Sequence, residues 1–266
     1  MQDPVAASLV SVEPPPLVPP ALVPSPEVPP PALPPTRGAR LAAIGEVVLT
    51  SGFPTQLTVG VLLLWAGLGA LTPDGRLSMR YVVTLWLVDA VLVIGVMLAL
   101  LRSRGEPLGP LLLGRRPALR EAWLGVAMVP VVFGLVVGSL TTVRWLWPGL
   151  HNVALNPFEG LIRSRSDAVI LGVIAGLGGI KEEFQRAFIL RRFEQHLGGA
   201  TAGLVIFSLV FGAGHFIQGW DVTIVTALLG LFWGALYLRR GSFSASAVSH
   251  TGFNVAQIVQ FVVLGS

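Results

Sequence analysis

YVVTLWLVDAVLVIGVMLALL, residues 81–101, decides the fold of this chain, because Asp89 is its only charged residue. A helix needs about 20 apolar residues to cross a hydrocarbon core about 30 Å thick. The whole composition agrees: 53% of the residues are hydrophobic and only 12% are charged, whereas soluble domains carry about 25% charged residues. The stretch therefore predicts a membrane-spanning helix.

Apolar runs of similar length recur from residue 56 to the end of the chain. They predict an all-α fold, a polytopic membrane helix bundle with about seven transmembrane helices. An amphipathic stretch near 41–51 precedes the first of them. The predicted spans are 56–72, 81–101, 121–143, 168–190, 201–217, 221–238 and 243–264. Small residues at Gly172, Gly176, Gly178 and Gly179 predict close packing of the fourth span against a neighbouring helix.

The first 40 residues differ from the rest, because proline dominates them, as in the runs at 14–16 and 29–31. Proline removes amide donors and favours extended polyproline II structure. We predict three parts of the chain: a disordered Pro-rich tail at 1–40, N-terminal transmembrane helices at 41–160, and a domain at 161–266 that carries the chemistry described below.

Arginine is distributed unevenly between the two sides of the predicted bundle. One side has Arg37, Arg40, Arg102, Arg104, Arg115, Arg116, Arg120, Arg191, Arg192, Arg239 and Arg240, and the other has Arg76, Arg80, Arg144, Arg163 and Arg165. The positive-inside rule then predicts a multi-pass protein of the cell membrane with a cytoplasmic N-terminus. Membrane lipid is the expected partner, and no nucleic acid is expected. The chain has no cysteine, which excludes disulfides, thiol catalysis and thiolate metal sites.

The fourth predicted span contains Lys181, Glu182, Glu183 and Arg186. Each charge inside a membrane costs about 2.5–3.5 kcal/mol at the centre on insertion scales, so these groups need partners or a wet cavity. On a helix Arg186 can pair with either glutamate, because it lies three or four residues away. Adjacent carboxylates also separate each other's pKa values, which suits a general base. The alternative is a salt-bridged cluster that only locks helices together.

Two histidines lie on later spans. His215 ends the glycine-rich stretch 211–215, where another backbone can approach closely. His250 and Asn254 are four residues apart on one helical face, where the amide can donate to an oxyanion beside the imidazole. Positions along the helices place the glutamates and both histidines at similar depths. The alternatives are a packed core histidine and an interhelical polar contact. Asp89 is either functional or bonded to a hydroxyl.

These residues, in this order, resemble the CAAX prenyl endopeptidase and bacteriocin-processing (CPBP) family of intramembrane proteases, also called the abortive-infection family. The resemblance covers roughly residues 165–262. The family pattern is Glu-Glu-x-x-x-Arg, then Phe-x-x-x-His, then His-x-x-x-Asn. The second and third motifs match at 211–215 and 250–254. The first departs, because only Phe184 and Gln185 separate the glutamate pair from Arg186. If Arg186 is the anchor, Lys181 takes the first glutamate position.

The resemblance implies an intramembrane endopeptidase that hydrolyses peptide bonds of membrane-associated substrates. In that mechanism a glutamate and His215 activate water, His250 and Asn254 stabilise the oxyanion, and Arg186 orients the carboxylates. Two alternatives stand for the cofactor: no metal, or Zn²⁺ held by Glu182 or Glu183 with His215 and His250. The functional alternatives are a catalytically inactive membrane scaffold or bacteriocin self-immunity protein, and a transporter that uses the intramembrane charges as an ion relay.

Overall fold

The computed structural model describes residues 34–114 and 116–264, and these residues form helices with no strand among them. The all-α prediction is confirmed. The helices are α1 (Arg37–Thr50), α2 (Phe53–Trp65), α3 (Met79–Ser103), α4 (Leu108–Leu112), α5 (Ala118–Leu146), α6 (Arg165–His196), α7 (Ala200–Ala213), α8 (Trp220–Arg240) and α9 (Phe243–Leu264), with short 3₁₀ helices η1 (Pro148–Leu150), η2 (Glu159–Leu161) and η3 (Phe216–Gln218). Most of the predicted tail at 1–40 lies outside the described residues, and residues 37–40 form the first turn of α1.

Every predicted span overlaps a helix, but the spans 56–72 and 201–217 run past the ends of α2 at Trp65 and of α7 at Ala213, and the count of seven is not confirmed. Four helices, α3, α5, α8 and α9, are long and apolar enough to cross a membrane, and the bent pair of α1 and α2 would make a fifth. The charges at 181–183 interrupt the apolar part of α6, although this helix has 32 residues. Helix α7 has only 14 residues. The protein is therefore a polytopic membrane helix bundle in which α6 and α7 differ from simple spanning helices.

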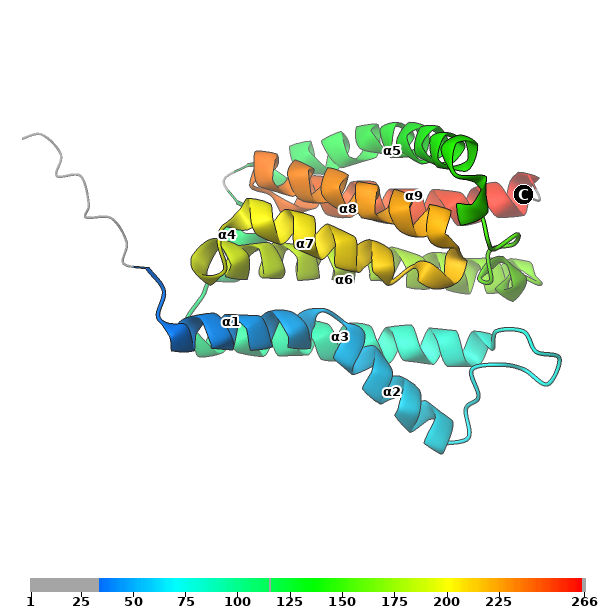
Figure 1. Cartoon of the computed structure of the whole chain (residues 1–266), viewed down its shortest axis with the longest axis horizontal. Helices are drawn as coiled ribbons and strands as arrows, with labels where there is room; N and C mark the ends of the chain where they lie inside the picture. Colours follow the sequence, from blue (N-terminus) through cyan, green and yellow to red (C-terminus); the bar gives the residue numbers. More distant parts are fainter. Residues whose placement is uncertain (1–33, 115, 265–266) are drawn as a thin grey trace, which may run out of the picture. The chain divides into compact units, whose positions relative to one another are not determined.

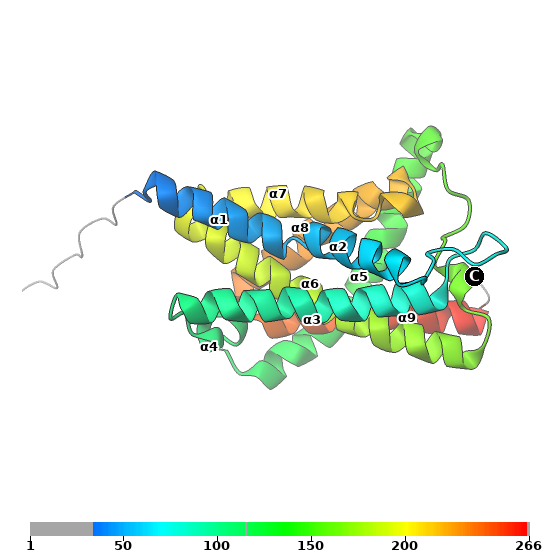
Figure 2. The same ribbon diagram turned by 90° about the horizontal axis from the view of Figure 1, so that it is seen from below.

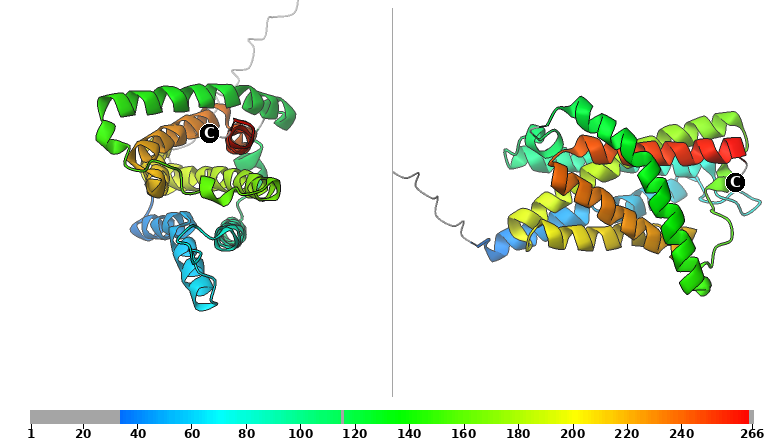
Figure 3. Two further views of the ribbon diagram at one scale, coloured as in Figure 1. Left: turned by 90° about the vertical axis from the view of Figure 1, so that its right-hand side faces the viewer. Right: turned by 90° about the horizontal axis from the view of Figure 1, so that it is seen from above.

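The helices of the described part pack in layers, with α6 near the centre. Helix α6 packs against α9, α3, α7 and α1, while α5 covers α9 and α8 pairs with α7. In the end-on view of Figure 3, α5 lies outermost on one side and the α1–α3 group lies on the other. Figure 2 shows α1 and α3 spread across the α6 and α7 layer. Side chains on different faces of α6 can thus reach three groups of helices.

Glycines mark the breaks between helices. Gly52 has φ +88° and separates α1 from α2, so the two helices meet at 44°. Figure 1 shows α2 diverging from α6 after this break. Gly198 and Gly199 have φ values of +98° and +100° and form the turn between α6 and α7. These left-handed conformations favour glycine, because a Cβ would clash with the backbone.

Small residues let α6 approach α9 closely. A Cβ added at Gly179 would lie 3.1 Å from the Thr251 hydroxyl and 3.2 Å from the Thr251 backbone nitrogen. At Gly176 the nearest atoms, from Thr251 and Val255, would be 3.5 Å away. Gly172 and Gly178 have no such neighbour within 4 Å. The predicted close packing is therefore confirmed at Gly176 and Gly179 and is wrong for the other two, because those positions do not face α9.

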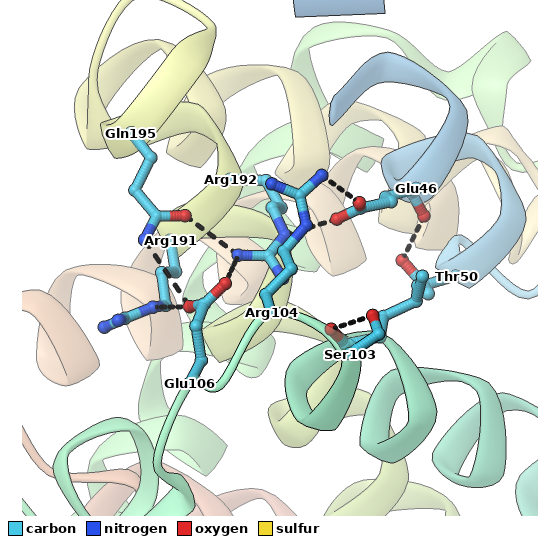
Figure 4. Close-up of polar contacts among 9 residues, drawn as sticks. Glu46, Thr50, Ser103, Arg104, Glu106, Arg191, Arg192 and Gln195 are labelled. Carbon is cyan, nitrogen blue, oxygen red and sulfur yellow. Dashed lines mark hydrogen bonds and ion pairs between the residues drawn. The ribbon is translucent and has the colours of Figure 1, made fainter. Parts of the chain in front are cut away.

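A network of arginines and glutamates ties the helices together at the arginine-rich end (Figure 4). Arg192 of α6 is fully buried. Its Nε lies 2.5 Å from Oε2 of Glu46 on α1, and its Nη1 lies 2.5 Å from Oε1 of Glu106 in the loop after α3. Arg104 also binds Glu46, and Arg191 also binds Glu106. Burial raises the pKa of Glu106, but hydrogen bonds and charge from Arg191 and Arg192 outweigh it and hold this pKa below the ordinary value of 4.5.

Candidate functional site

The central feature of the site is the buried carboxylate of Glu183 on α6. Its side chain is bound by Arg186, whose Nε donates to both carboxylate oxygens at 3.2 Å. On its other side, Oε1 lies 3.0 Å from Nδ1 of His250 on α9. A carboxylate only accepts hydrogen bonds, so Nδ1 carries the hydrogen when Glu183 is ionised. Glu183 thus joins two helices through a guanidinium and an imidazole.

Glu182 lies at the other nitrogen of the same imidazole. Its Oε2 is 3.6 Å from Nε2 of His250, and its side chain is 26% exposed, whereas that of Glu183 is fully buried. With the hydrogen on Nδ1, the neutral ring presents Nε2 as an acceptor toward a second acceptor. One proton shared between Nε2 and Glu182 would resolve that opposition. The more accessible carboxylate is therefore the one beside a proton-accepting nitrogen.

Arg186 is completely buried and connects α6 to α7 and α8. Its Nη1 donates to the Gly230 carbonyl at 2.9 Å. Its guanidinium lies over two aromatic rings, 5.3 Å from the centroid of Phe207 and 5.0 Å from that of Phe211. Its Nη2 lacks a hydrogen-bond partner within the residues that the structure describes. These contacts fix the guanidinium, and the guanidinium in turn fixes the Glu183 carboxylate.

His215 was expected on a spanning helix, but α7 ends at Ala213 and His215 precedes η3. Its Nδ1 lies 2.9 Å from the Phe211 carbonyl oxygen. The ring of Phe211 is a neighbour of both histidines, with its centroid 5.1 Å from that of His215 and 6.0 Å from that of His250. Across the described ranges, no hydrogen bond or ion pair joins His215 to a carboxylate.

Asn254 lies one turn after His250 on α9 and contacts the backbone of α6. Its Nδ2 donates to the Ala175 carbonyl at 3.1 Å. Thr251 makes a similar bond, because its hydroxyl donates to the Gly176 carbonyl at 3.2 Å. One amide hydrogen of Asn254 is therefore used in holding α9 against α6, and one remains.

Lys181 faces away from this site, toward the N-terminal helices. Its Nζ lies 3.0 Å from Oδ2 of Asp89, and both side chains are buried. Asp89 also accepts from the Thr55 hydroxyl at 2.5 Å and from Gln56 Nε2 at 3.3 Å. The hydroxyl partner considered for Asp89 is thus present. The carboxylates that meet His250 are Glu182 and Glu183, whichever way the first motif is aligned.

The residues considered as zinc ligands, in the alternative that includes a metal, do not gather into a metal site. Between residues 34 and 264, leaving out 115, no group of three or more His, Asp or Glu residues is arranged to hold a metal ion. The two nitrogens of His250 face Glu183 and Glu182, and Nδ1 of His215 is engaged by a backbone oxygen. The described residues do not fit a metal in this arrangement, and the proposed mechanism uses protein groups alone.

One aromatic residue of the site carried no signal in the sequence. Trp233 of α8 is buried, and its ring stacks on that of His250 with centroids 3.8 Å apart and planes 14° apart. A tryptophan within an apolar helix is usually core or an interface anchor. Only the packing of α8 against α9 shows that this ring lies on an imidazole.

An apolar cavity of about 380 Å³ lies between the α1–α2 break and the α6–α7 pair. Phe207, which also contacts Arg186, is part of its wall. The cavity is lined by Val47, Val48, Ser51, Phe53, Pro54, Ile189, Phe193, Ile206, Phe207 and Val210. The candidate glutamates and histidines are not among these residues.

A family model described as type II CAAX prenyl endopeptidase Rce1-like matches residues 164–256. This segment begins at the residue that caps α6 and ends within α9, so it includes all six predicted site residues. The predicted resemblance to the CAAX endopeptidase family is confirmed, and at this level the segment is similar to membrane peptidases. No curated protein and no solved structure matches the chain.

Proposed function

We propose that this protein is an intramembrane endopeptidase that hydrolyses peptide bonds of membrane-associated peptides or proteins. The observation that carries the proposal is the imidazole of His250 held between two carboxylates, 3.0 Å from Glu183 and 3.6 Å from Glu182. Charged groups are expensive in a membrane and are kept there for function or for a specific pairing. The match to a peptidase family over 164–256 supports the functional reading.

In the proposed mechanism Glu182 is the general base. Glu183 is compensated by Arg186 and His250, whereas Glu182 is partly exposed and has no guanidinium against it among the described contacts. Glu182 takes a proton from water, and the water oxygen attacks the carbonyl carbon of the peptide. The C–N bond then breaks, and the proton passes from Glu182 to the leaving amine. The facing Nε2 of His250 can share this proton.

His250, Asn254 and His215 are proposed to act around the oxyanion. Imidazolium at His250 would stabilise the negative charge that develops on the carbonyl oxygen. The free amide hydrogen of Asn254 would donate from the next turn of α9. His215 would come into reach of the oxyanion by a movement of the 214–219 segment, since among the described contacts its side chain is held by the Phe211 carbonyl and ring. Arg186 keeps the role of orienting Glu183.

A catalytically inactive membrane scaffold or bacteriocin self-immunity protein is the second candidate. Three observations favour it: the first motif departs from the family pattern, His215 has no carboxylate partner among the described contacts, and Asn254 binds a backbone carbonyl. In such a protein the charged cluster would serve only to hold α6, α8 and α9 together. A transporter has no comparable observation in its favour.

Cleavage of a membrane-tethered peptide separates these functions. The purified protein in liposomes is expected to cut the peptide, and Glu182→Gln should lower the rate by about 10²–10⁴-fold, because general base catalysis contributes that much. Glu194→Gln is the matched control, because Glu194 is exposed near the end of the same helix. Equal cleavage by Glu182→Gln and the wild type would refute the assignment. A parallel reaction with a chelator tests whether metal is needed.

A further inference from the structure

The ring of Trp233 defines the plane in which His250 can lie. The indole and imidazole are nearly parallel, at 14°, with centroids 3.8 Å apart. The ring of Phe211 is nearly perpendicular to the imidazole, with an interplanar angle of 89° and ring centroids 6.0 Å apart. Because an imidazole can turn about its Cβ–Cγ bond, a flat neighbour at van der Waals distance blocks rotation out of the stacked plane.

Trp233 is itself held by a hydrogen bond, by apolar packing and by the close approach of its helix to α7. Its Nε1 donates to the Ser249 hydroxyl at 3.2 Å, so it is bonded to the residue next to His250. Its side chain is 1% exposed and belongs to the apolar cluster with Phe253. Gly230 and Gly234 on the same helix lie against α7, where an added Cβ would meet Ser208 and Leu204. The indole therefore has little freedom to move.

We infer that Trp233 is a positioning residue that keeps the His250 imidazole in the plane where Nδ1 meets Glu183 and Nε2 faces Glu182. Rotation out of this plane would break the 3.0 Å contact with Glu183 and turn Nε2 away from Glu182. The catalytic consequence rests on the proposed peptidase function, but the stack itself does not.

Tryptophan fluorescence gives a test that needs no enzymatic activity. An imidazole in van der Waals contact with an indole quenches its emission, so at one fixed pH the full-length His250→Gln variant in detergent should emit more strongly than the wild type.

Three variants assign the signal. The rise on His250→Gln is expected also in a Trp123→Phe background, because Trp123 is 67% exposed and lies on α5. It should be absent in a Trp233→Phe background, which lacks the stacked indole. A rise that survives in the Trp233→Phe background, or no rise in the chain that keeps Trp233, would overturn the inference.

Cleavage kinetics then separate positioning from simple stability. Trp233→Phe keeps an aromatic face and should retain most of kcat, whereas Trp233→Leu should lose up to about 100-fold in kcat with little change in KM, because misplacement of a reacting group has costs of this size. Equal rates for the Phe and Leu variants would contradict a positioning role. If the wild type itself cuts nothing, the proposed function fails, while the fluorescence experiment still decides whether the stack exists.

Discussion

Removing one partner of the Lys181–Asp89 pair should strongly destabilise the protein. The two side chains are 8% and 1% exposed and their charged atoms are 3.0 Å apart. At an effective dielectric constant of about 20, two charges at this distance attract by about 5 kcal/mol. Breaking a buried pair from one side costs about 3–5 kcal/mol, because the remaining charge stays buried. Among the described residues, Lys181→Met leaves Asp89 with the neutral donors of Thr55 and Gln56.

Thermal unfolding in detergent measures this loss. For a chain of this size a change of 1 kcal/mol shifts Tm by about 2–4 °C, so Lys181→Met should lower Tm by about 6–20 °C. The double variant Lys181→Met with Asp89→Asn should recover most of the loss, because replacing a whole buried pair by neutral groups is often nearly neutral. Asp74→Asn is the control, since its pair with Arg76 is about half exposed and surface ion pairs contribute little to stability.

The reasoning fails if Lys181→Met unfolds at the same temperature as the Asp74→Asn control. It also fails if the double variant is less stable than Lys181→Met alone, because the loss would then come from packing rather than from an unpaired charge. Cleavage measured below the lowered Tm would further show whether the link between α6 and the N-terminal helices bears on activity.

Three other predictions concern the rest of the fold. The pKa of Glu106 is held below 4.5 by two arginines. The ionised carboxylate therefore stabilises the fold above pH 4.5, and this stabilisation is lost as the pH falls through the lowered pKa. The Tm measured from about pH 6 to about pH 3 should decline less steeply in Glu106→Gln than in the wild type. Gly179→Ala should cost about 1–3 kcal/mol, because its Cβ would press on α9 at 3.1–3.2 Å, whereas Gly178→Ala should be tolerated in its open surroundings. The chain has no cysteine, so variants with one introduced cysteine report the membrane topology. With a cytoplasmic N-terminus, an impermeant maleimide applied to intact cells should label Ser166→Cys and should not label Ser103→Cys. The reverse labelling would place the N-terminus outside.

The sequence alone was enough for the fold class, because hydropathy is a local property. Each apolar run, such as 81–101, specifies a helix whatever its neighbours are. The spacing of Glu182, Glu183 and Arg186 likewise predicted that the arginine pairs with one of the two glutamates, since residues three or four apart meet on any α-helix, and the structure shows that the partner is Glu183. The resemblance of 165–262 to CAAX endopeptidases also depended only on the order of short motifs.

Tertiary packing decided which polar side chains of different helices contact each other. Neighbouring positions on one helix point about 100° apart, so Lys181 and Glu182 face different helices, and the sequence does not state which. The approach of α9 brings His250 between two glutamates, and the approach of α8 lays Trp233 on its ring. The early end of α7 leaves His215 beyond the helix, beside the ring of Phe211. Local patterns specify each helix, but only the closeness of packed helices selects which polar groups meet.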